Sequence, residues 1–191
     1  MTAYIINFNS VIQMTDEQFY QLCRSNPEVK FERNAQGELI IMPPTGGETG
    51  RSNAELTADF VIWNRQTQLG EVFDSSTCFK LPNGANRSPD VAWIRRDRWE
   101  TLTSDQKKRF PAIVPDFVLE LMSPTDTLRD ARTKMQEYLE SGVKLAWLIN
   151  PQNRQVEVYR LGRSVEVLDT PIQLLGEEIL PGFVLNLNAI W

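Results

Sequence analysis

The chain has 191 residues, 41% of them hydrophobic and 24% charged, which predicts one compact domain and excludes disordered or fibrous proteins. Its net charge of -5 argues against a protein that coats nucleic acid or an anionic membrane through bulk charge. It has no histidine, which excludes Ser-His-Asp and Cys-His nucleophiles, histidine-dependent zinc sites and histidine general bases. The chemistry left to the chain is that of carboxylates, lysines and hydroxyls.

The cysteine content and the N-terminus bear on where the protein works. Cys23 and Cys78 are too few and too far apart for a disulfide framework or a Cys-x-x-Cys site, which favours reduced thiols in the cytosol. The first residues carry no basic segment ahead of an apolar one, and no apolar stretch approaches about 18 residues. We therefore expect a cytoplasmic protein without a membrane segment, folded as a single domain over residues 1–191.

The first third of the chain predicts a helix, a hairpin and a second helix. Residues 14–27 place apolar side chains at helical spacing after a threonine N-cap, and the segment ends at a proline. Residues 29–33 and 38–42 flank the turn 34–37 and form the two strands of the hairpin. Apolar residues then recur with a period of about 3.6 over residues 51–66, which predicts a longer helix.

The rest of the chain predicts a sheet with one crossover helix. Strand candidates lie at residues 71–82, 90–96 and 116–122, bounded by turns and by the polar stretch 103–109. Residues 125–142 have the clearest helical pattern. An apolar strand follows at residues 144–150, and together with the preceding strand and helix it predicts a right-handed parallel crossover. Short antiparallel strands are expected after it, at residues 155–162, 164–169 and 183–187.

Two acidic residues stand out on neighbouring strands. Glu120 shares one strand face with Val118 and Met122, and a carboxylate among apolar neighbours needs a cation, a set of hydrogen bonds or a metal ion. A buried ion pair is the alternative explanation. Asp90 closes the turn 87–89 and opens the next strand, so it is either a turn aspartate or a functional acid.

A lysine on the crossover helix completes the candidate set. Lys134 lies at the edge of the apolar stripe, close around the helix axis to Tyr138, so it can face the sheet. Asp130 precedes it by one turn and could orient its ammonium group. The alternative is an ordinary solvated lysine with a surface ion pair.

Two further acids are weaker candidates. Glu55 could be an additional acid from an early helix, but a capping box with Ser52 explains it well. Asp116 begins the strand that carries Glu120, and four residues of strand span roughly 13 Å. Ligands of one Mg²⁺ ion lie about 2.1 Å from it, so Asp116 is too far from Glu120 to share a metal unless the strand bends. Asp90 has no such limit.

Two converging acids and a lysine suit metal-assisted hydrolysis of phosphodiester bonds. Hard oxygen ligands hold Mg²⁺ or Mn²⁺, and a nearby ammonium assists without histidine. Two basic runs are candidates for a local phosphate track, with solvated loops as the alternative. These runs contain Arg95, Arg96 and Arg98 and, further along, Lys107, Lys108 and Arg109.

The order and spacing of several segments resemble those of the Uma-type endonucleases of the PD-(D/E)xK superfamily, over roughly residues 15 to 190. The segments are GELIIMPP, SPDVAWI, PDFVLELMSP, DARTKMQEY, SGVKLAWLINP and VEVYRLG. The resemblance implies a restriction-endonuclease-like α/β fold, in which a mixed β-sheet is flanked by helices. The predicted N-terminal helix and hairpin and the C-terminal antiparallel strands would be additions to this core.

The resemblance also implies roles for the candidate residues. Asp90 would be the first acid and Glu120 the second, with a divalent metal between them. The superfamily pattern has a lysine two residues after the second acid, where this chain has Met122. The resemblance therefore suggests a migrated lysine, supplied by Lys134 from the following helix.

The leading hypothesis is a metal-dependent endonuclease with nucleic acid, DNA more than RNA, as its partner. The competing hypothesis is a catalytically inactive nuclease-fold module that binds DNA or another protein, and Met122 favours it. A homodimer would suit cleavage of both strands of a duplex. The apolar C-terminal segment could meet a second subunit, although the core is the favoured place for most of it; it contains Leu185, Leu187, Ile190 and Trp191.

Overall fold

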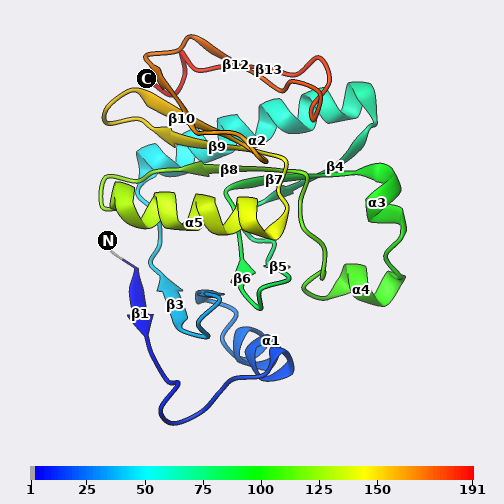
Figure 1. The fold of residues 1–191 in the computed structure, drawn as a ribbon, viewed down its shortest axis with the longest axis vertical. Coiled ribbons are helices and arrows are strands. Elements are labelled where there is room, and N and C mark those ends of the chain that lie inside the picture. Colours follow the sequence, from blue (N-terminus) through cyan, green and yellow to red (C-terminus); the bar gives the residue numbers. More distant parts are fainter. Residues whose placement is uncertain (1–2) are drawn as a thin grey trace.

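The computed structural model describes residues 3–191. At its centre, a six-stranded mixed sheet carries helix α2 (Gly47–Thr67) on one face and helix α5 (Leu128–Ser141) on the other (Figure 1). The strand order of this central sheet is β11-β10-β9-β8-β7-β4. Its strands are β4 (Gly70–Asp74), β7 (Val91–Arg95), β8 (Phe117–Leu121), β9 (Leu145–Asn150), β10 (Gln155–Arg160) and β11 (Glu166–Asp169).

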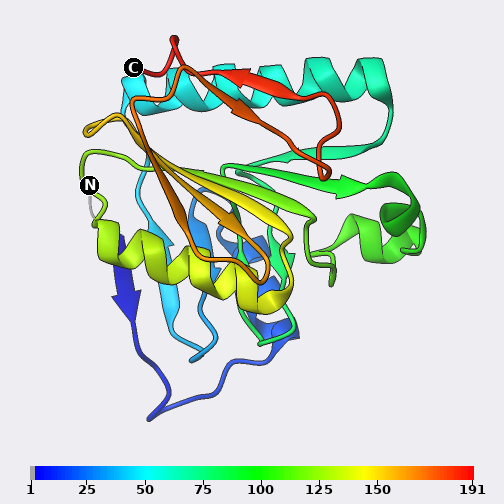
Figure 2. The same cartoon turned by 45° about the horizontal axis from the view of Figure 1, so that its top comes forward.

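A five-stranded sheet, here called the N-terminal sheet, lies on the α5 side of the central sheet (Figure 2). Its strand order is β1-β3-β2-β6-β5, and helix α1 (Asp16–Ser25) buries Phe19 against it. The helix begins after Thr15, which forms a capping box with Gln18, so the predicted start is confirmed. The strands are β1 (Tyr4–Ile6), β2 (Lys30–Arg33), β3 (Leu39–Met42), β5 (Phe79–Lys80) and β6 (Asn86–Arg87).

The predicted hairpin and crossover are both present. Strands β2 and β3 are antiparallel and joined by the turn 34–37. Strands β8 and β9 are parallel and joined through α5, and every residue of β9 is buried. Gly142 ends α5 with a φ of 105°, a left-handed conformation that a residue with a Cβ rarely adopts. This connection places the inner face of α5 over the strand that carries Glu120.

Helix α2 begins earlier than the sequence pattern predicted. It starts at Gly47 with Gly46 as its N-cap, so Ser52 lies inside the helix and is buried. The predicted capping box of Ser52 and Glu55 is therefore wrong. The apolar period did not reveal the first turn because that turn is made of glycines and polar residues that face the cleft described below.

Two other segments differ from their predictions. Residues 71–82 form two strands, β4 and β5, in different sheets rather than one strand. The polar stretch 103–109 contains a short helix with its own capping box, formed by Thr103 and Gln106. The two short helices of this region are α3 (Arg96–Glu100) and α4 (Ser104–Lys108).

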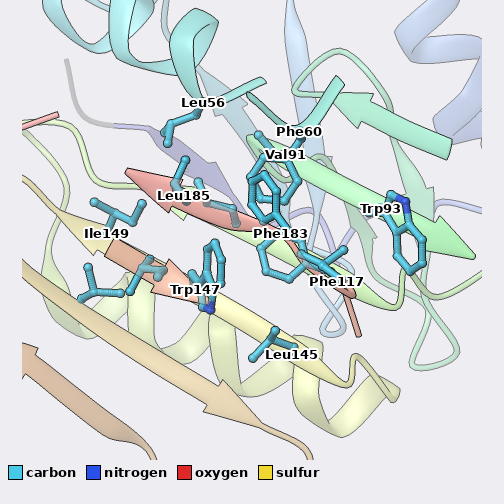
Figure 3. Close-up of a cluster of buried hydrophobic side chains, with 14 of the residues drawn as sticks. Leu56, Phe60, Val91, Trp93, Phe117, Leu145, Trp147, Ile149, Phe183 and Leu185 are labelled. Atoms are coloured by element: carbon cyan, nitrogen blue, oxygen red, sulfur yellow. The ribbon is translucent and has the colours of Figure 1, made fainter. Parts of the chain in front are cut away.

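The largest hydrophobic core lies between α2 and the central sheet. Phe60 from α2 stacks on Phe117 of β8 and contacts Phe183 near the C-terminus, and Trp147 of β9 packs edge-on to Phe117 (Figure 3). Complete burial of one such side chain stabilises the fold by about 1.5–3 kcal/mol. The C-terminal strands β12 (Gln173–Leu175) and β13 (Val184–Asn186) cover this core, and buried residues there include Leu185, Leu187 and Ile190. The expectation that most of this apolar segment joins the core is confirmed.

Two general features of the described chain bear on its chemistry. Cys23 and Cys78 are both free cysteines. Among the helices of residues 3–191, none has the length and apolar character needed to cross a membrane.

Candidate active site

Asp90, Glu120 and Lys134 line one cleft with a volume of about 660 Å³. They come from three elements: the turn before β7, the strand β8 and the helix α5. The first turn of α2, the end of β3 and the loop after β8 form much of the remaining wall, and Asn53 and Lys30 also face the cleft. The fold thus brings the three predicted site residues into one place.

The backbone of β8 holds Asp90 in position. Its Oδ2 atom accepts a hydrogen bond from the backbone N–H of Leu121 at 2.8 Å, and its Oδ1 atom accepts one from the Asn53 side-chain amide at 3.2 Å. Leu121 follows Glu120 directly, so the two acids are neighbours across strands. Burial raises the pKa of Asp90, while the Leu121 N–H opposes this shift.

Glu120 faces α5 from the middle of the central sheet. Its Oε1 atom lies 2.8 Å from the ammonium Nζ of Lys134 and accepts a hydrogen bond from the Tyr138 hydroxyl, also at 2.8 Å. Burial raises the pKa of Glu120 to about 7. Lys134 opposes this shift, and the negative charges of Asp90 and Glu32 reinforce it.

Lys134 is not a solvated lysine. Its side chain is 16% exposed, and Nζ lies between Glu120 Oε1 at 2.8 Å and Glu32 Oε1 at 3.0 Å. Burial alone lowers the pKa of Lys134, but these two carboxylates raise it above its ordinary value. Asp130 does not orient the ammonium as expected: its carboxylate bonds Thr127, the N-cap of α5, and lies near Arg129.

Glu32 is a site residue that the sequence analysis missed. It lies on β2 with only 2% of its surface exposed, and it accepts hydrogen bonds from the Ser88 backbone N–H at 2.9 Å and from Arg87 at 3.0 Å. Burial raises its pKa, but the charges of Lys134 and Arg87 prevail and lower it to about 2. Glu32 is therefore a carboxylate at any pH near neutrality.

The oxygen donors of the cleft fit a hard divalent cation. Within residues 3–191, no group of three or more His, Cys, Asp or Glu side chains is arranged to hold a metal. Asp90 and Glu120 nevertheless converge, and the Oδ1 atom of Asn53, next to Asp90, is buried without a hydrogen-bond partner. Two carboxylates and an amide oxygen are ligands that Mg²⁺ and Mn²⁺ accept, with water completing the coordination.

Comparison with known proteins identifies the family and the fold of the chain. A family model described as "Uma2: Putative restriction endonuclease" matches residues 16–188. The chain belongs to this family. A solved structure described as a "putative nuclease belonging to DUF820" from Anabaena variabilis resembles the chain with a TM-score of 0.72 and 19% identity, over 85% of this chain and 90% of that one. No curated protein matches the chain.

Membership of the Uma2 family confirms the resemblance and the restriction-endonuclease-like fold that the sequence predicted. The methionine at position 122 also has a structural explanation. Met122 is buried in the core that β8 shares with α5, so a charged side chain there would face apolar neighbours. The ammonium beside Glu120 comes instead from α5.

Tyr138 and Asn53 are two further cleft contacts of this Uma2 chain that sequence reasoning did not assign. Tyr138 was expected only in the apolar stripe of α5, yet its hydroxyl bonds Glu120. Asn53 lies near the start of α2 and inside the predicted helix 51–66, but its place beside Asp90 was not part of the prediction. Glu55 was the candidate acid nearest to Asn53 in the sequence, but it is exposed and is not among the described residues that line the cleft.

Asp116 lies at the other end of β8 from the cleft and has a separate function in the fold. Its carboxylate is 2.8 Å from both Lys144 and Arg98 and accepts a hydrogen bond from the Arg95 backbone N–H at 3.0 Å. Burial raises its pKa, but these three donors prevail and lower it. Asp116 therefore anchors the ends of β7 and β9 beside β8 and does not compete with Asp90 for the cleft.

Asp116→Asn is expected to destabilise the protein by about 1–3 kcal/mol at pH 7 without changing cleavage. Because folding lowers the pKa of Asp116, its stabilisation is present above the ordinary carboxyl value of 3.8 and is lost as the pH falls through the lower folded value. Urea unfolding at pH 7 and pH 3 measures this effect. An equal loss of stability at both pH values would contradict this assignment.

The two basic runs lie away from the cleft. Strand β7 extends from Val91, next to Asp90, to Arg95, so the runs follow its far end. None of their residues is among the described residues that line the cleft. Several are ion-paired, which argues against a phosphate track there; the pairs are Arg95 with Asp97, Arg98 with Asp116, Lys108 with Asp105 and Arg109 with Glu17.

Proposed function

We propose that the protein is a metal-dependent endonuclease that hydrolyses phosphodiester bonds of nucleic acid, with DNA preferred to RNA. The observation that carries this proposal is the convergence of Asp90, Glu120 and Lys134 in one cleft. Membership of a family described as putative restriction endonucleases supports the same reaction class. A cation held by the two acids would also offset part of the repulsion between nucleic acid and a chain of net charge -5.

The roles of the residues follow from their contacts. Asp90 and Glu120 would hold Mg²⁺ or Mn²⁺, which when bound supplies an activated water molecule and neutralises charge on the phosphate. Tyr138 donates its hydroxyl hydrogen to Glu120 Oε1 and so orients that carboxylate. Lys134 keeps a positive charge in the cleft, where its Nζ can donate hydrogen bonds to the scissile phosphate or the attacking water.

A catalytically inactive nuclease-fold module is the second candidate function, because Met122 occupies the position of the lysine in the superfamily pattern. In such a module, the ion pair of Lys134 and Glu120 would only stabilise the fold. Binding of DNA or of another protein would then be independent of divalent metal. Metal dependence therefore separates the two functions.

The first test is cleavage of supercoiled plasmid, single-stranded DNA and RNA in the presence of Mn²⁺ or Mg²⁺. We expect wild-type protein to cut DNA, and Asp90→Asn to cut it more than about 100-fold more slowly, since the variant loses a metal ligand. Glu157→Gln is a suitable control, because Glu157 is a buried acid of another ion pair, with Arg132, outside the cleft. Cutting that persists in chelator, or unchanged cutting by Asp90→Asn, would refute the proposal.

We also propose that residues 1–191 act as one restriction-endonuclease-like domain and that two copies form a cytoplasmic homodimer. Two copies would present one cleft to each strand of a duplex. Cys23 and Cys78 form no disulfide, and free thiols are usual in cytosolic proteins. Light scattering from the purified chain measures the oligomeric state, and a monomer at micromolar concentration would refute the dimer.

A further inference from the structure

Lys134 is shared by two carboxylates that come from different sheets. Glu120 Oε1 belongs to β8 of the central sheet and lies 2.8 Å from Nζ. Glu32 Oε1 belongs to β2 of the N-terminal sheet and accepts a hydrogen bond from Nζ at 3.0 Å. The N-terminal sheet and α5 lie beside one another in both views of the fold (Figures 1 and 2), so this contact crosses from one layer to the next.

Glu32 is held more firmly than Glu120. Besides Lys134, its two oxygens bond the Ser88 backbone N–H and the guanidinium of Arg87, and the side chain is 2% exposed against 15% for Glu120. Arg87 in turn forms an ion pair with Glu137 on α5. The carboxylate of Glu32 is thus fixed by the end of β6 and tied to the helix that carries Lys134.

We propose that Glu32 is a positioning residue for Lys134, so that the N-terminal sheet completes the active site. This inference rests on the proposed nuclease function. Glu120 has a second proposed role as a metal ligand, and a lysine anchored by Glu120 alone would share its only partner with a cation. Glu32 is not among the described residues that line the cleft, and its contacts with Arg87 and Ser88 fix the carboxylate that accepts a hydrogen bond from the Lys134 ammonium.

The first test uses the metal-free full-length protein and does not depend on activity. Acetic anhydride modifies lysine amines, and peptide mass spectrometry reports the rate at each lysine. We expect Lys134 to react slowly in wild type and in Glu120→Gln, and about tenfold or more faster in Glu32→Gln, relative to Lys144 in the same sample. Unchanged protection in Glu32→Gln, or loss of protection in Glu120→Gln alone, would overturn the proposal.

Folding is controlled in two ways. Near-UV circular dichroism checks that Glu32→Gln is native, and Glu157→Gln supplies a variant that loses a comparable buried acid elsewhere. Lys134 should stay protected in Glu157→Gln. If Glu32→Gln does not fold, Glu32→Asp keeps the charge but shortens its reach, and it should expose Lys134 in the same assay; continued protection in that variant overturns the proposal.

The second test is a double-mutant cycle on the rate of metal-dependent DNA cleavage. In an otherwise wild-type chain, Glu32→Gln should lower kcat by about tenfold or more. In a chain that already carries Lys134→Met, the same substitution should cause no further loss of kcat. Equal losses in both backgrounds would show a merely structural role and overturn the proposal. If wild type shows no metal-dependent cutting, the proposed nuclease function fails, while the labelling experiment still decides what holds Lys134.

Discussion

Glu120→Gln is expected to abolish metal-dependent cleavage and the stabilisation of the fold by Mn²⁺. Glutamine keeps the size of the side chain and a hydrogen-bond acceptor for Tyr138, but it removes the charge that a divalent cation requires. For a wild-type site at a Mn²⁺ concentration of about 100 times Kd, mass action gives about 2.7 kcal/mol of stabilisation. In a chain of this length that is a rise in Tm of about 5–10 °C, measurable by differential scanning fluorimetry.

The metal-free protein supplies the control for this variant. Folding raises the pKa of Glu120 from 4.5 to about 7, because the buried carboxyl is more stable when it is neutral. This contribution to the stability of the fold is fully present below pH 4.5 and is lost as the pH rises through 7. Glu120→Gln should remove this loss of stability at high pH. In the absence of metal, the Tm of the variant at pH 8 should therefore be no lower than that of wild type. A variant that still shows the full Mn²⁺ shift would show that Glu120 is not a ligand.

Lys134→Met is expected to lose both cleavage and stability while it retains metal binding. Methionine has a similar shape but leaves Glu32 and Glu120 without their shared cation, and breaking a buried ion pair costs about 3–5 kcal/mol. Cleavage should fall about 100- to 1000-fold if the ammonium stabilises charge on the phosphate. Urea unfolding and single-turnover cleavage measure the two effects separately.

Lys144→Met is the matched control for this variant. Lys144 also forms an ion pair, with Asp116 directly before β8, but its side chain is 42% exposed and lies at the far end of that strand from the cleft. It should lose little stability and no activity. If Lys134→Met cleaves as fast as wild type in Mn²⁺, the catalytic role of Lys134 is rejected, while the roles of Asp90 and Glu120 are judged by their own variants.

The sequence alone determined most of the central sheet and the identity of the two acids. Strand and helix periodicity identified β7, β8, α5 and β9, because each repeats its apolar pattern over at least one full face. Glu120 stood out because a carboxylate within an apolar strand is costly to bury, and Asp90 because it opens the neighbouring strand. The superfamily resemblance then suggested Lys134, although the proposed roles of all three residues await the experiments above.

Only the tertiary structure decided which other groups surround these residues. Glu32 lies in the short strand β2, where three of four residues are charged and no pattern singles it out. The pairing of β2 with β6 and the docking of the N-terminal sheet on α5 bring it to Lys134, 102 residues along the chain. Asn53 lies within the predicted helix, but periodicity could not show that its side chain reaches Asp90, 37 residues further along the chain. The basic runs looked available because two of their acidic partners, Asp116 for Arg98 and Glu17 for Arg109, are distant in sequence. Periodicity reports which face of an element is buried, whereas the contacts of a charged group depend on register and layer packing, which no local pattern encodes.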